Sequence, residues 1–72
     1  MPQNAAPRIA EQWVVELEQR IARQERLIGR LEPGGNPDML REARALLDTL
    51  REARRHAVES LDELRREPKN AG

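Results

Sequence analysis

The sequence predicts an all-α fold, an antiparallel hairpin of two long helices in a single domain over residues 1–72. Two stretches, residues 5–31 and 37–66, repeat hydrophobic side chains with the helical period. Between them lies LEPGGNPDM, whose glycines and prolines interrupt helices. With 36% charged and 38% hydrophobic residues, the chain is too periodic for a disordered protein and too polar for a membrane protein. We expect frayed ends at residues 1–3 and 67–72.

The first helix is expected over about residues 5–31. Its hydrophobic positions alternate four and three residues apart, as in a heptad repeat, and Trp13 and Leu27 lie on one flank of that stripe. Asn4 is the expected N-cap, and Pro7 falls in the first turn, where a missing N–H is tolerated. The stripe consists of Ala10, Val14, Leu17, Ile21, Gln24, Ile28 and Leu31.

The turn is expected over residues 32–36. Pro33 disfavours the helical conformation of the residue before it, and Gly34 and Gly35 can take the positive φ that ends a helix. Asn36 is expected to cap the second helix, and Pro37 supplies a preset φ at its first position. The segment therefore stops one helix and starts another, and so short a connection makes the helices antiparallel neighbours.

The second helix is expected over about residues 37–66, ending before Pro68. Its hydrophobic stripe is about 140° wide on a helical wheel, which is typical of a helix with two neighbours. The stripe consists of Met39, Leu40, Ala43, Leu46, Leu47, Leu50, Ala53, Ala57, Val58, Leu61 and Leu64.

Two packed helices alone leave the outer part of both stripes in water. We therefore predict a homodimer of hairpins that forms a four-helix bundle, or docking onto the helices of another protein. The expected oligomer interface consists of Val14, Leu17, Ile21, Gln24, Ile28, Leu46, Leu50, Ala57 and Leu61.

Two polar residues interrupt the stripes, and each has two interpretations. Gln24 either fixes the register of the bundle through a hydrogen bond, or lies at the edge near Ala43 and Ala45 in contact with solvent. Arg54 either stacks on the indole of Trp13 or lays its stem on apolar surface and sends its charge outward. Trp13, the single aromatic residue, is expected to fill an interface or the core.

The chemical inventory is poor in catalytic groups. The chain has one serine, one threonine, one histidine and no cysteine or tyrosine, so we expect no enzymatic activity and no small-molecule substrate or cofactor. His56 has Glu52 and Glu59 at helical spacing, but one imidazole on an open helix face is not a metal site. The start MPQNAAPRIAEQ lacks the features of a secretory signal, so the expected location is the cytoplasm, away from membranes.

Charge offers an alternative function. Thirteen basic and thirteen acidic residues cancel, so nucleic-acid binding would need a local patch. Glu16 with Arg20 and Asp62 with Arg66 have the spacing of ordinary solvated ion pairs. The candidate nucleic-acid contacts are Arg20, Arg23, Arg26, Arg30, Arg51 and Arg55.

Residues 17–64 also carry a resemblance. The run QRIARQERLIGRLEPGG from Gln19 to Gly35, followed by AxxLLxxL at Ala43 to Leu50, resembles a group of short, uncharacterised bacterial helical-hairpin proteins. The architecture is similar to Rop-type dimeric hairpins, which implies a homodimeric four-helix bundle and, in the alternative, a small regulator that binds RNA. We expect a non-catalytic helical module for self-association or protein interaction.

Overall fold

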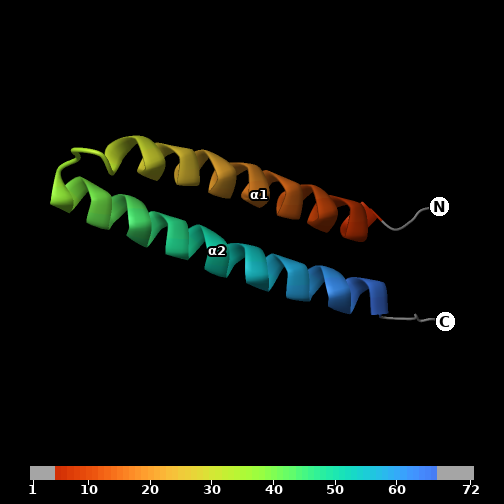
Figure 1. The fold of residues 1–72 in the computed structure, drawn as a ribbon. Coiled ribbons are helices and arrows are strands. Elements are labelled where there is room, and N and C mark those ends of the chain that lie inside the picture. The colour runs from red at the N-terminus through yellow and green to blue at the C-terminus, as the bar shows by residue number, and fades with distance from the viewer. Residues whose placement is uncertain (1–4, 67–72) are drawn as a thin grey trace.

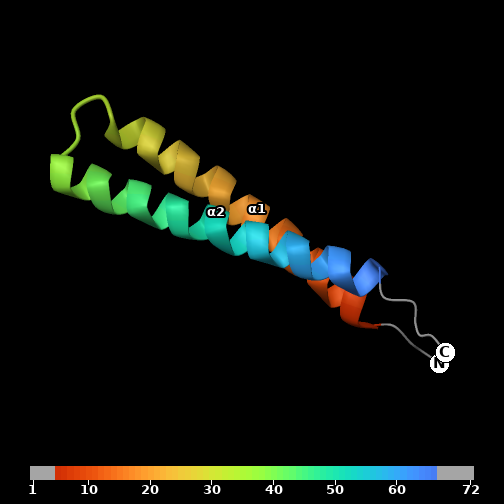
Figure 2. The same ribbon diagram turned by 90° about the horizontal axis from the view of Figure 1, so that it is seen from below.

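The computed structural model describes residues 5–66. Helix α1 spans Ala5–Leu31 and helix α2 spans Pro37–Arg66. They lie side by side and antiparallel, with the turn at one end and the start of α1 beside the end of α2 at the other (Figure 1). Turned by 90°, the same pair is seen to cross (Figure 2). The two packed helices of the predicted hairpin are confirmed, and their bounds coincide with the expected ranges.

The turn depends on its two glycines. Gly34 has a φ of 154°, in the region that side chains with a Cβ rarely adopt. At Gly35 a Cβ would collide with the carbonyl oxygen of Leu31, so no side chain fits there without moving the backbone. The amide of Glu32 donates to the carbonyl oxygen of Ile28 over 2.9 Å and so closes α1.

The start of α2 is capped as the sequence predicted. The side-chain oxygen Oδ1 of Asn36 accepts hydrogen bonds from the backbone amides of Asp38, at 2.8 Å, and Met39, at 3.3 Å. Asp38 lies in the first turn, where its negative charge suits the positive end of the helix dipole. The expected N-cap of α1, Asn4, and the stop at Pro68 lie outside the described residues, as do the expected frayed ends.

The core is thin and concentrated toward the turn. Ile28, Ala43 and Leu47 form one buried cluster, and Ile21, Leu31 and Leu40 pack against it half-buried. Toward the other end, Leu17 is 1% exposed and Leu61 is also buried. Buried hydrophobic side chains among the described residues number five, all supplied by the two predicted stripes. So few buried side chains give a hairpin little free energy of folding on its own.

Gln24 lies between the helices. Its amide nitrogen Nε2 donates a hydrogen bond of 2.9 Å to the backbone carbonyl oxygen of Ala43, and the pair is partly buried. The bond places residue 24 of α1 level with residue 43 of α2. The structure thus supplies the hydrogen-bonding partner that the first interpretation required, and this partner is the Ala43 that the second interpretation named as its neighbour.

No segment within residues 5–66 combines the length and the hydrophobicity that a membrane-crossing helix requires.

Candidate interaction surface

One broad side of the hairpin, here called the ion-pair face, joins the helices by four salt bridges. Its acidic members recur every seven residues, three of them along α1 and the fourth, Glu32, directly after its end, and this spacing keeps them on one side of the helix. Their arginine partners all come from α2. Three pairs have nitrogen to oxygen distances of 2.8 to 3.0 Å. The pairs are Glu11 with Arg65, Glu18 with Arg54, Glu25 with Arg51, and Glu32 with Arg44.

These pairs lie at the surface, with both side chains of each about half exposed. Each contributes only about 0.2 to 1 kcal/mol, because water competes for the charges. Four in a row nevertheless favour one register and one rotation of the helices about their axes, since a shifted α2 would separate every pair. The ion-pair face therefore acts mainly on which register and rotation the two helices adopt, and adds little to the free energy of folding.

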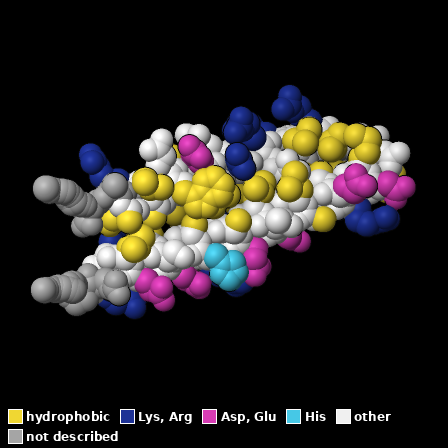
Figure 3. All heavy atoms as spheres, turned by 180° about the vertical axis from the view of Figure 1, so that it is seen from behind, with side chains coloured by type: hydrophobic (Ala, Val, Ile, Leu, Met, Phe, Trp, Pro, Cys, Tyr) yellow, Lys and Arg dark blue, Asp and Glu magenta, His cyan; other side chains and the backbone are white. Residues whose placement is uncertain are grey.

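The opposite side, here called the open face, carries six of the seven large hydrophobic side chains that are exposed in the described part of the chain; the seventh, Val15, lies elsewhere on α1. Trp13 is 42% exposed and Leu46 is 48% exposed. Figure 3 looks onto this side and shows hydrophobic side chains running along the molecule, with basic groups mostly along the α1 edge and acidic groups and the histidine along the α2 edge. The open face consists of Ile9, Trp13 and Leu27 from α1 and Met39, Leu46 and Leu64 from α2.

Trp13 borders a hollow in this face. The guanidinium carbon of Arg20 lies 5.7 Å from the centroid of its ring, close enough for a cation–π contact. The hollow lies between the helices and is lined, besides Trp13, by His56 and by the small residues Ala10, Ala53, Ala57 and Ser60. The predicted alternative in which Arg54 stacks on the indole is wrong. The guanidinium of Arg54 forms a salt bridge with Glu18, and the guanidinium over the Trp13 ring is that of Arg20.

The residues predicted as an oligomer interface have different positions in the structure. Leu17, Ile28 and Leu61 are buried against the other helix of the same chain, so the expected interface must be corrected there: little of their surface remains for a second molecule. The side-chain amide of Gln24 is already hydrogen-bonded to Ala43 of the same chain. Val14, Ile21, Leu50 and Ala57 are half-buried, and Leu46 lies exposed on the open face.

The structure does not gather the candidate nucleic-acid arginines on one surface. Arg51 reaches Glu25 on the ion-pair face, and Arg55 pairs with Glu52 at 2.6 Å. Arg20 lies over Trp13, next to the open face. The three others are exposed on α1 and have no ion-pair partner among residues 5–66; they are Arg23, Arg26 and Arg30.

His56 lies between two carboxylates, as its spacing indicated. Its Nε2 is 3.7 Å from Glu52 and its Nδ1 is 3.8 Å from Glu59. Both carboxylates and the imidazole come from one exposed helix surface. In the described part of the chain, no three acidic or histidine side chains are placed to share a metal ion.

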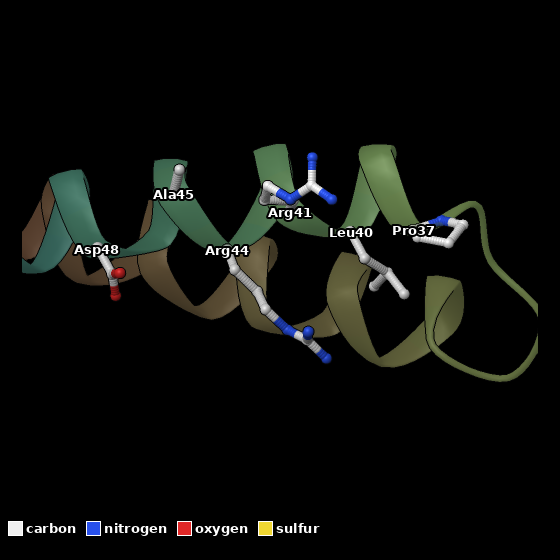
Figure 4. Close-up of a pocket in the computed structure, with 6 residues that line it drawn as sticks. All are labelled: Pro37, Leu40, Arg41, Arg44, Ala45 and Asp48. Atoms are coloured by element: carbon white, nitrogen blue, oxygen red, sulfur yellow. The ribbon is translucent and has the colours of Figure 1, made fainter.

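A further hollow lies on α2 near the turn, over Pro37, Leu40 and Ala45 (Figure 4). Arg44 extends from it toward α1, whereas Arg41 points away (Figure 4). Both guanidiniums have carboxylate partners, Glu32 for Arg44 and Asp38 for Arg41. The two arginines at this hollow are therefore already paired, and its remaining charged residue is Asp48.

Comparisons with protein-family models, with curated proteins and with solved structures found no match to the chain. The open face thus has to be interpreted from its own geometry. The sequence pattern places Trp13 and Leu27 together on one flank and predicts that Trp13 fills an interface or the core, but neither residue is among the nine predicted interface residues. The missed signal is that Met39, Leu46 and Leu64 form the corresponding flank of α2, which an antiparallel pairing brings to the same side.

Proposed function

We propose that the protein is a non-catalytic self-association module, in which a second copy of the hairpin covers the open face. The observation that carries this proposal is the division of the molecule into an ion-pair face and an open face. Six large hydrophobic side chains are exposed on one side, and a contiguous patch of this kind is characteristic of interaction sites. The thin core adds to the argument, because a hairpin of this size gains stability when a partner buries the rest of its stripes.

The test is sedimentation equilibrium at micromolar concentrations, with helicity followed by circular dichroism in the same samples. The variant Leu46→Glu is compared with Val15→Glu. Val15 is the matched control, since it is 49% exposed against 48% for Leu46 but does not belong to the open face. We expect a helical dimer for the wild-type chain and for Val15→Glu, and a dissociation constant raised at least tenfold by Leu46→Glu, because a charge would enter an apolar contact.

Two results would overturn the proposal. One is a wild-type chain that stays a helical monomer at every concentration. The other is a Val15→Glu variant that dissociates as readily as Leu46→Glu, since the open face would then have no special role.

The second candidate is a small nucleic-acid-binding regulator. It is supported by the exposed Arg23, Arg26 and Arg30, whose charges have no carboxylate partner among residues 5–66. Fluorescence anisotropy with a labelled RNA hairpin, repeated at rising salt, tests it. Binding that weakens with salt and is lost on replacing Arg23 and Arg26 with glutamine would favour the regulator over the self-association module.

A further inference from the structure

The α1 edge of the open face is basic. At about 100° per residue, Arg20, Arg23 and Arg30 lie within about 60° of Leu27 around the helix axis. Glu16 is the acidic residue in the same sector, so this edge has an excess of positive charge. Figure 3 shows the basic side chains along the α1 edge.

The α2 edge has the opposite charge. Glu42 lies about 40° beyond Leu46 on the helical wheel and is the charged residue within about 60° of it, whereas Asp38 and Glu63 lie farther out, at about 80° and 100°. No lysine or arginine of the described residues falls in that outer sector of α2. One face therefore carries a hydrophobic centre with a positive edge and a negative edge.

The opposite charges of the two edges distinguish the two symmetric ways in which two hairpins can stack with their open faces together. If the twofold axis runs parallel to the helices, α1 of each copy lies against α2 of the other, and positive edges meet negative edges. If the axis runs across the helices, α1 meets α1 and α2 meets α2, so like charges are brought together, which disfavours that arrangement.

The positions of the residues along the helix axes, here called their heights, fit the first arrangement. The bond from Gln24 to Ala43 sets these two residues level, and because the helices are antiparallel, Arg23 and Glu42 then lie about 3 Å apart in height, two rises of 1.5 Å. An axis parallel to the helices preserves height, so Arg23 of one copy meets Glu42 of the other. Likewise Trp13 meets the small residues Ala53 and Ala57 of the second copy, which line the hollow at the height of Trp13. A large side chain opposite small ones lets the two faces interlock.

We propose that the two copies dock with α1 of each hairpin against α2 of the other, so that both turns lie at the same end of the four-helix bundle. This inference rests on the proposed self-association. It specifies the partner, a second copy of this chain, and the direction in which it binds.

The experiment uses the absence of cysteine from the chain. A nitroxide label is attached to the single cysteine of a Pro33→Cys variant, in the exposed turn, and separately to that of Arg8→Cys, near the other end. Pulsed dipolar spectroscopy then measures the distance between the two labels of a dimer. We expect both distances below about 30 Å; turns at opposite ends would separate the labels by more than about 40 Å, roughly the length of a helix at 1.5 Å per residue.

Charge reversal provides the second measurement. Arg23→Glu and Glu42→Arg should each raise the dissociation constant of the dimer about tenfold, and the double variant should restore it. Arg26→Glu is the control, because Arg26 lies on the outer side of α1 and should change the constant little.

The outcomes separate the two proposals. A chain without dimers overturns the proposed function. A dimer whose labels lie far apart, or whose double reversal is as weak as the single ones, overturns only the arrangement.

Discussion

The amide nitrogen of Gln24 donates a hydrogen bond to the carbonyl oxygen of Ala43 across the hairpin, 2.9 Å away. This carbonyl lies inside α2, where the helical pattern gives it a second donor, the amide of Leu47. The bond therefore ties the helices at one height without being needed to satisfy Ala43. Gln24 stands beside the buried cluster of Ile28, Ala43 and Leu47.

Two replacements of Gln24 separate the stability that comes from its hydrogen bond from the stability that comes from its packing. Gln24→Ala should lower the free energy of unfolding by about 1 kcal/mol or more, since it removes both the hydrogen bond and side-chain packing. Gln24→Leu should be at least as stable as the wild-type chain, because the Ala43 carbonyl keeps its helical donor and the leucine adds apolar contact. Urea unfolding followed by circular dichroism at one fixed protein concentration measures both. A Leu variant as unstable as the Ala variant would contradict this account.

Replacement by alanine should change the stability of the fold in opposite directions at Gly35 and at Gly29. Gly35→Ala should destabilise the fold by about 2 kcal/mol or more, because its Cβ would collide with the backbone of Leu31. Gly29→Ala should stabilise it by about 0.5 to 1 kcal/mol, since Gly29 lies inside α1 and an added methyl group meets no atom within 4 Å. Thermal unfolding of the two variants at equal concentration provides the comparison, and equal shifts would refute the role given to Gly35.

The pair of Glu25 and Arg51 tests the ion-pair face. A double-mutant cycle with Glu25→Gln and Arg51→Gln should give a coupling energy of about 0.2 to 1 kcal/mol, and high salt should reduce it. The same cycle on Glu25 and Arg26 is the control, because these sequence neighbours form no ion pair in the structure. A coupling no larger than that of the control would show that this contact does not select the register.

Much of the hairpin could be predicted because its signals are local. The cap at Asn36, the stop at Pro33 and the glycine turn act between residues at most four positions apart, so the sequence displays each of them directly. The pattern of apolar residues likewise indicated which stripe of each helix faces its neighbour, and Leu17, Ile28, Leu47 and Leu61 are buried accordingly.

The open face was harder to predict, because each stripe is wider than one neighbouring helix can cover. Which flank stays exposed depends on how far each helix is rotated about its axis. Glu18 and Glu25 could be recognised as ion-pair residues only once the register brought Arg54 and Arg51 beside them. The ion pair expected between Glu16 and Arg20 from their spacing is not formed in the structure, where the guanidinium of Arg20 lies over the Trp13 ring.

The two helices, their ends and the turn follow from the order of the residues, since capping, proline and glycine geometry and hydrophobic period act over short stretches of chain. Only the packing of the two helices brings three glutamates of α1, and Glu32 of the turn, to four arginines of α2 on one side, leaving Trp13, Leu27 and Leu46 uncovered on the other. Rotation and register are set by many weak contacts between residues far apart in the chain, and these contacts become definite only when both helices pack together.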